Sequence, residues 1–390
     1  MNYNIFLILP LLLALFQSVG LQAAPDWTAA TTTGPRQDFE RKFSQTYDVN
    51  DNGSVRLENR YGEINVTTWT QNRVQIDVLV KVSASSQDKA NDIFDRITID
   101  FTGGGNRATA TTSIGNAKKG GFWESLFGDA VSISWGNSSN DYKIYYNVKM
   151  PAAATLETVA KYCDVRLPAL SGDNTTTVGY GDLVAGKLTG SNTVEISYGS
   201  IRAEELGKMS SLRQRYSEAT IRKADRLKYD GRYSELTLNT ANIVTLDVGY
   251  EEVDIERAQK VTINGNYNDV ELGEVDVFEF DGSYTGYSVD KVNTSITGET
   301  NYGDVDVDAL GSNFTKVYIR TRYADVNLGM PSGRGYDVDI NTRYGDIGFR
   351  GDGQLNRNSE GTAESLKGKV SGSGQGSVDI STSYGDVSLR

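Results

Sequence analysis

The sequence has no histidine, one cysteine (Cys163) and only six prolines among 390 residues. Without histidine, the usual general base at neutral pH is missing, so Ser-His-Asp, Cys-His and His-zinc chemistries are excluded. One cysteine cannot form an internal disulfide. Acidic residues outnumber basic ones, 51 to 39, and no basic run is present, which argues against nucleic-acid binding. We expect neither catalytic residues nor a cofactor.

The N-terminus has the composition of an export signal. Residues 5–16 are a short apolar run, followed by small residues up to a cleavage point near Ala23 or Ala24. The run is too short to span a membrane, although the preceding MNYN lacks the expected Lys or Arg. We predict a signal peptide over residues 1–24 and no transmembrane segment in the mature chain. A retained anchor is the alternative.

A tyrosine-centred motif returns along the chain at steps of 17 to 21 residues, with one final step of 40. Regular spacing of this length is typical of solenoids, whose units must stack because none buries its apolar face alone. The motif tyrosines are Tyr162, Tyr180, Tyr198, Tyr216, Tyr233, Tyr250, Tyr267, Tyr284, Tyr302, Tyr323, Tyr344 and Tyr384, and an early copy contains Tyr61. The full Tyr-Gly-Asp form occurs at Tyr180-Gly181-Asp182, Tyr302-Gly303-Asp304, Tyr344-Gly345-Asp346 and Tyr384-Gly385-Asp386.

Each unit contains two strand patterns of period two. In residues 244–255, apolar side chains alternate from Val244 to Tyr250 and resume at Val253. The parity changes at the motif, which we interpret as a corner: Tyr ends the inward series, Gly permits the tight backbone and Asp bonds nearby amides as an Asx-turn. We predict an all-β, single-stranded parallel β-helix with coils of about 17–21 residues, right-handed as parallel crossovers are.

The repeats do not cover the whole chain evenly. Residues 25–160 predict an N-terminal β-rich cap that includes the first coils and one short helix, capped by Ser85 or Ser86. Such a cap covers the otherwise open edge of a solenoid. Residues 161–390 predict the β-solenoid itself. Residues 350–376 are polar and rich in glycine, and we expect a flexible loop there.

Three features resemble a known family: the exported N-terminus, NRYGEINVTTWTQNRVQIDVLVKV at 59–82, and NVKMPAAATLETVAKYCDVRLPALSGD at 147–173. The chain is similar to the Gram-negative envelope proteins called "putative adhesins", whose solenoids are related in style to autotransporter adhesin heads. The resemblance implies the fold and an exported location, but no catalytic residues, since none is known for the family. Cys163 departs from the glycine usual at its motif position.

The third motif position is acidic in most coils. In register, these carboxylates would lie about 4.8 Å apart along one edge. They could bind Ca²⁺, for which Asp304, Asp325 and Asp346 are candidates. The interpretation we favour is structural: cross-coil ion pairs with the basic residues that precede the tyrosines, namely Arg60, Lys161, Arg215, Arg232, Arg322 and Arg343.

Other candidates each have a simpler interpretation. The tyrosine column could stack on sugar rings, but its parity favours a core ladder. Phe122, Trp123 and Phe127 are off-pattern aromatics that could contact a ligand or pack on the cap. Cys163 fits a small buried residue better than a reactive thiol. Arg-Gly-Asp at 350–352 is attributed to chance.

The sequence therefore favours an exported, non-enzymatic β-solenoid of a Gram-negative envelope, in the periplasm or at the surface. It would act as an adhesin-like or scaffolding module whose rigid face binds by avidity, with a cell-surface glycan or an envelope protein as partner. The alternatives are a lyase-like, carbohydrate-active β-helix enzyme and a periplasmic scaffold or sensor of envelope stress.

Overall fold

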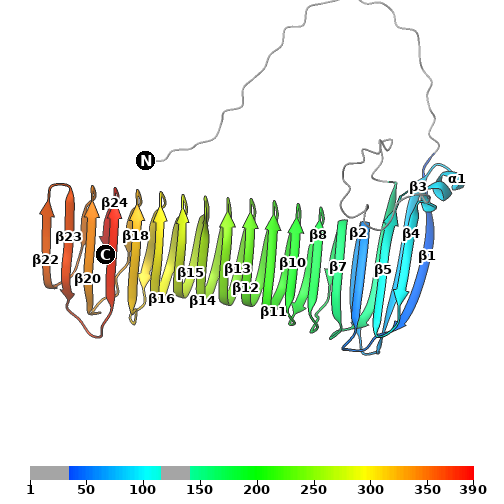
Figure 1. Cartoon of the computed structure of the whole chain (residues 1–390), viewed down its shortest axis with the longest axis horizontal. Coiled ribbons are helices and arrows are strands. Elements are labelled where there is room, and N and C mark those ends of the chain that lie inside the picture. Colours follow the sequence, from blue (N-terminus) through cyan, green and yellow to red (C-terminus); the bar gives the residue numbers. More distant parts are fainter. Residues whose placement is uncertain (1–34, 116–140) are drawn as a thin grey trace, which may run out of the picture.

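The computed structural model describes residues 35–115 and 141–390, which form one elongated β-solenoid with a single helix. Strands lie side by side along the long axis, and each coil stacks on the next (Figure 1). Inward-facing Val, Leu and Ile side chains form one continuous buried core along the molecule. Burial of each such side chain contributes about 1.5–3 kcal/mol, so the stacking itself holds the coils together. The predicted parallel β-helix is confirmed.

The N-terminal end is a mixed sheet that covers the first coil. β1 pairs antiparallel with β3, β3 antiparallel with β6, and both β5 and β6 run parallel to β2. β4 pairs antiparallel with β5. The elements are β1 (Gln37–Asp48), β2 (Ser54–Trp69), β3 (Arg73–Ala84), α1 (Gln87–Phe94), β4 (Ile97–Gly103), β5 (Arg107–Ile114) and β6 (Tyr142–Pro151).

The predicted helix lies in this end of the molecule. Its N-cap is Ser86, whose side chain accepts a hydrogen bond from the backbone N–H of Lys89 at 3.4 Å. Ala90 and Phe94 are its buried residues, and they lie four positions apart, which places them on one face. The helix and one of its two predicted caps are confirmed.

The central coils are regular because each strand pairs with its counterpart one coil away. β8 pairs with β10 at an offset of 18 residues, and β13 pairs with β14 at an offset of 17. The strands are β7 (Thr155–Leu167), β8 (Asn174–Gly179), β9 (Leu183–Leu188), β10 (Asn192–Ser197), β11 (Ser200–Arg215), β12 (Glu218–Arg232), β13 (Glu235–Gly249), β14 (Glu252–Asn266), β15 (Asp269–Ser283), β16 (Gly286–Asn301) and β17 (Val305–Leu310).

The C-terminal end departs from chain order. β24 pairs with β18 on one side and with β20 on the other, so the final strands lie inside the stack, as the red β24 in Figure 1 shows. The strands here are β18 (Lys316–Arg322), β19 (Val326–Leu328), β20 (Tyr336–Arg343), β21 (Ile347–Phe349), β22 (Gly353–Glu360), β23 (Ala363–Val370), β24 (Ser377–Ser383) and β25 (Val387–Leu389).

The segment expected to be a flexible loop is instead a β-hairpin. β22 and β23 pair antiparallel, and β23 pairs antiparallel with β20, so the hairpin covers the last coil. Arg357 contributes to this cover by donating to the backbone oxygen of Ile347 and to Glu364. A polar, glycine-rich composition resembles a linker, but here the strands are held by backbone pairing and bury few side chains.

Candidate functional site

The motif tyrosines take a backbone conformation that is rare for any residue except glycine. All thirteen, from Tyr61 to Tyr384, have φ between 52° and 62°. The left-handed region costs an L-residue about 1–2 kcal/mol. We expected the motif glycine to provide the tight backbone, and this was wrong. Gly181 and Gly303 do not have positive φ, and the tyrosine itself makes the corner.

The tyrosine side chains form an exposed ladder along one edge of the solenoid. Neighbouring rings lie 4.7–5.1 Å apart between centroids and are nearly parallel. From Tyr162 onward, each tyrosine is 42–52% exposed. The prediction of a stacked ladder is confirmed, but its assignment to the core was wrong. The positive φ points the tyrosine side chain outward and the side chain of the next residue inward. Strand alternation alone predicts the opposite orientation for the tyrosine.

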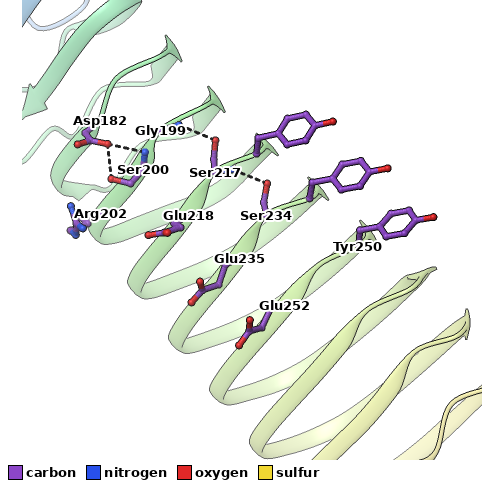
Figure 2. A pocket seen from close by; sticks show the side chains of 12 residues that line it. Asp182, Gly199, Ser200, Arg202, Ser217, Glu218, Ser234, Glu235, Tyr250 and Glu252 are labelled. Atoms are coloured by element: carbon purple, nitrogen blue, oxygen red, sulfur yellow. Dashed lines mark hydrogen bonds between the residues drawn. The ribbon is translucent and has the colours of Figure 1, made fainter. Parts of the chain in front are cut away.

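The ladder presents mainly ring edges and hydroxyl groups, because every ring between its two ends has a neighbouring ring against each face. In Figure 2 the ring of Tyr250 extends away from the coil with its hydroxyl at the tip. At one end, Tyr142 contacts Tyr61 edge-on at 5.5 Å and covers the last face there. A sugar that stacks face-on would need an open ring face. The ladder instead offers a straight row of hydrogen-bonding groups with one tyrosine per coil.

The residue after each tyrosine faces the interior. Where it is glycine, the neighbouring coil is too close for a side chain: a Cβ on Gly303 would lie 2.0 Å from the backbone oxygen of Thr285. In the central coils it is polar, and each side chain accepts the backbone N–H of its counterpart one coil earlier at 3.0–3.4 Å. The side chains of this buried polar ladder belong to Ser217, Ser234, Glu251, Asn268 and Thr285.

Glu251 is the one carboxylate in the buried polar ladder. It is 3% exposed, accepts a hydrogen bond from the Tyr229 hydroxyl, and accepts another from the backbone N–H of Ser234 at 3.0 Å. Burial raises the pKa of Glu251 to about 7. Gly231 gives the pair its space, since a Cβ there would lie 2.3 Å from a Glu251 carboxylate oxygen. Sequence reasoning missed this pair; the only signal was Glu at a position that is elsewhere small or neutral.

The acidic third position is exposed and does not form the predicted Asx-turn. The carboxylate of Asp304 accepts the backbone N–H of Asp325 at 2.8 Å, Asp325 accepts that of Asp386, and Asp386 accepts that of Asp346. Asp386 therefore separates two of the calcium candidates. Across the described parts of the chain, no group of three or more acidic or other metal-ligating side chains could hold a metal ion. Calcium binding at these residues stays an untested prediction.

The ion pairs expected across the corners are formed with other partners. Arg215 binds Asp230 at 2.9 Å, and Arg232 binds Asp247 at 2.6 Å. Both aspartates lie on the strands that lead into the tyrosine corner, on the opposite side of the ladder from Glu218 and its equivalents. The prediction that these arginines neutralise the third-position carboxylates was wrong, because the arginine side chains turn back along their own face.

A shallow groove of about 680 Å³ lies beside the ladder. Tyr216, Tyr233 and Tyr250 form one side, and the side chains of Glu218, Glu235 and Glu252 form the other, as Figure 2 shows for most of them. The three glutamates occupy equivalent positions in successive coils. The groove is straight and open, so it suits an extended ligand rather than an enclosed small molecule.

Cys163 is 2% exposed and receives a hydrogen bond from the Asn59 side chain at 3.4 Å. Burial raises the pKa of its thiol to about 12, so the thiolate is scarce at neutral pH. This confirms the prediction of a small buried residue.

Phe122, Trp123, Phe127 and the predicted signal peptide over 1–24 lie outside the described residues. No helix within 35–115 or 141–390 is long and apolar enough to cross a membrane.

Several solved structures are similar to this chain at low sequence identity and low TM-score. A "putative cell adhesion protein" from Clostridium sporogenes is 10% identical, with a TM-score of 0.20, over 90% of this chain and 99% of that one. A "putative adhesin" from Parabacteroides distasonis is 11% identical, with a TM-score of 0.29, over 75% and 93%. A "putative lipid binding protein" from the same organism is 11% identical, with a TM-score of 0.28, over 74% and 92%. These scores are too low to indicate a ligand.

No curated protein matches the chain in sequence. A family model does match, and it covers residues 193–390, which are 198 of the 390 residues and contain most of the tyrosine corners. The expected membership of a family of repeat proteins is confirmed by this match. The chain belongs to the Toastrack family, DUF4097.

Proposed function

We propose that this protein is an exported, non-enzymatic binding module of the bacterial cell envelope, adhesin-like or scaffolding, that holds an extended partner along its tyrosine ladder. The observation that carries the proposal is the ladder itself: thirteen tyrosines in one straight row, most of them about half exposed. Left-handed φ at every one of them is unfavourable, and glycine would make the same corner without strain. Such strain at repeated positions favours a role for the side chain at the surface.

The spacing of the ladder supports binding by avidity. Each coil adds one hydroxyl and one ring edge about 4.8 Å from the last, on a scaffold held by strand pairing throughout. A long partner with a repeated structure would make many weak contacts at once, and linked contacts give far higher affinity than single ones. A cell-surface glycan or an extended envelope protein has this form.

A binding experiment with matched variants tests the proposal. Labelled full-length protein is applied to arrays of immobilised bacterial polysaccharides and to intact Gram-negative cells. The ladder variant Y216S/Y233S/Y250S should lose at least roughly tenfold in apparent affinity, because avidity multiplies the loss. The control K228S/T245S/T262S changes three residues of neighbouring coils on another face and should bind like the wild type. Equal binding by both variants would contradict the proposal.

Export and location are tested separately. A tagged copy is treated with protease or antibody on intact cells and on lysed cells. Labelling on intact cells supports a surface role, and protection until lysis supports a periplasmic scaffold. Retention of the protein in the cytoplasm would contradict the proposal. Shortening of array glycans by the purified protein would instead favour the lyase-like alternative.

A further inference from the structure

All the described strands belong to one sheet, and the strand at its C-terminal end has an open edge. β22 pairs with β23 and with no other described strand. It is the outermost strand at that end of the rod in Figure 1, and seven of its eight residues are exposed. An open edge offers backbone hydrogen-bonding groups to another strand, and a second chain can extend a sheet in this way.

The hydrogen bonds of the hairpin show which backbone groups of β22 are available. The N–H of Ser371 donates to the backbone oxygen of Asp352 at 2.8 Å, and this pair continues the register of β22 with β23. Hydrogen-bonded and non-bonded pairs alternate along an antiparallel ladder. The N–H and C=O groups of Gly353, Leu355 and Arg357 therefore point away from β23, toward the open edge.

β22 lacks the features that usually protect an edge strand. Such strands carry charges, prolines or bulges, or are covered by another element. β1, at the opposite end of the rod, carries Arg41 and Lys42, and α1 packs against it. β22 has no proline, and its register with β23 is continuous. Its one charged residue in mid-strand, Arg357, turns back to donate to the backbone oxygen of Ile347 and to Glu364, so its charge does not protect the edge.

The inner side chains of β22 are complementary to a second, antiparallel copy of the same strand. A two-fold axis at Leu355 sets this residue opposite itself, so that two half-buried leucines cover each other. Arg357 then lies opposite Gly353, which leaves room for its side chain and keeps the two arginines apart. These residues also have the outward N–H and C=O groups, so the opposed pairs can form backbone hydrogen bonds across the axis.

The outer side chains fit the same register. Gln354 lies opposite Asn356 of the second copy, and two amides can bond to each other because each has both a donor and an acceptor. Asn358 lies opposite Asp352 and can donate to its carboxylate. A row of neutral amides is thus complementary to itself, which a row of like charges is not.

Neighbouring registers set like charges against each other. An axis at Asn356 places Asp352 opposite Glu360, and an axis at Arg357 places two arginines opposite each other. Like charges directly opposite on neighbouring strands destabilise a sheet. The axis at Leu355 avoids both contacts, so the sequence of β22 selects it.

We propose that two copies of this protein associate end to end through antiparallel pairing of their β22 strands, about a two-fold axis at Leu355. The edge is thus occupied by a second copy, held by the same kind of strand pairing that builds the rod. This goes beyond the binding role of the tyrosine ladder, because it uses another part of the molecule. One strand pair buries less area than a standard interface, so the dimer is reversible and depends on concentration.

Cysteine cross-linking tests the register. Leu355→Cys places two thiols directly opposite each other across the axis, within reach of a disulfide. Asn358→Cys places them six residues apart along the strands, about 20 Å. Under a mild oxidant, L355C should form a covalent dimer on a non-reducing gel, and N358C should not. The native Cys163 is buried in both variants and should not interfere.

Analytical ultracentrifugation of the full-length protein tests the association itself. The wild type should form a dimer whose fraction rises with concentration. Leu355→Lys sets two ammonium groups opposite each other, so the dimer should weaken by at least roughly tenfold. The control Ser312→Lys adds the same charge at an exposed position outside the hairpin and should associate like the wild type. Thermal unfolding verifies that both variants fold.

The proposal would be overturned by a monomer at every concentration, by equal weakening in L355K and S312K, or by cross-linking of N358C as readily as of L355C. A monomer whose open edge binds a strand of a different protein would also overturn it. The ladder variant Y216S/Y233S/Y250S should dimerise like the wild type. Failure of the ladder proposal and failure of this one are therefore distinguishable.

Discussion

The hydroxyl of Tyr229 donates a hydrogen bond to the carboxylate of Glu251, which belongs to the next coil, and both side chains are buried in the solenoid. The structure holds an ionisable group inside central coils whose other buried side chains are apolar or neutral polar groups. Its protonation state is therefore coupled to the stability of the central coils.

We expect the stability of the protein to fall as pH rises from about 4.5 to about 7. Burial raises the pKa of Glu251 from 4.5 to about 7, so the folded state binds the proton more tightly than the unfolded state. The favourable contribution is complete below pH 4.5 and is lost as pH rises through 7, by about 3 kcal/mol from a shift of this size. Urea unfolding of wild type and Glu251→Gln across this range measures it. Equal pH slopes for the two proteins would contradict the assignment.

Two substitutions of Tyr250 separate backbone strain from ring stacking. Tyr250→Ala removes two stacked neighbours but keeps positive φ, and should lower the free energy of unfolding by about 2 kcal/mol. Tyr250→Gly removes the same contacts and relieves the strain, so the loss should be smaller by roughly 0.5–1 kcal/mol. Chemical denaturation gives both values. A larger loss for glycine than for alanine would show that the corner is not strained.

Replacement of a motif glycine by a residue with a side chain should destabilise the protein for a steric reason. Gly303→Ala places a Cβ 2.0 Å from the backbone oxygen of Thr285, so two coils must separate locally, at about 1–3 kcal/mol. Gly286→Ala is the matched control, because its nearest neighbour would be 3.9 Å away. Thermal unfolding should show a clear decrease for the first variant and little change for the second. The reverse order would argue against the close approach at Gly303.

The inserted position of β24 can be tested with disulfides. Arg320 and Ser381 are register partners on adjacent strands, whereas Arg320 and Asn341 would be neighbours only if the coils stacked in chain order. The variant R320C/S381C should therefore form a disulfide readily, since adjacent strands meet the required spacing. R320C/N341C should remain reduced under the same oxidant. Gel mobility with and without reductant reports the outcome. A disulfide in R320C/N341C and none in R320C/S381C would show that the coils stack in chain order.

The repeat could be predicted from the sequence because one strong signal, apolar alternation about a fixed tyrosine, recurs in every coil. The outward position of Tyr250 could not, because it depends on the sign of one dihedral angle, and Tyr in the left-handed region is improbable from residue preferences alone. The hairpin at β22 and β23 was missed because its strands bury little apolar surface, so no hydrophobic pattern marks them.

The site was less predictable than the fold. The acidic third position was recognised, but its partners were not, because the side to which Arg215 and Arg232 turn depends on the bend of the corner. The step of 40 residues between Tyr344 and Tyr384 has the length of two coils. The sequence has no local signal that Tyr384 would stack between Tyr323 and Tyr344.

The interleaving of β24 between β18 and β20 has a consequence for assembly. A solenoid whose coils follow chain order can add each coil to the previous one as soon as it is available. Here that progression halts after β18, because the strand that pairs with β18 next is β24. This strand comprises residues 377–383 and comes much later in the chain than β18. Until β24 is in place, the coil of β20 pairs only with β23 of the end hairpin and has no strand pairing with the rest of the solenoid. The coil of β20 and the end hairpin can therefore join the rest of the solenoid only when residues 377–383 pair with both β18 and β20. Chain termination before residue 383 would leave the rod without its C-terminal layers.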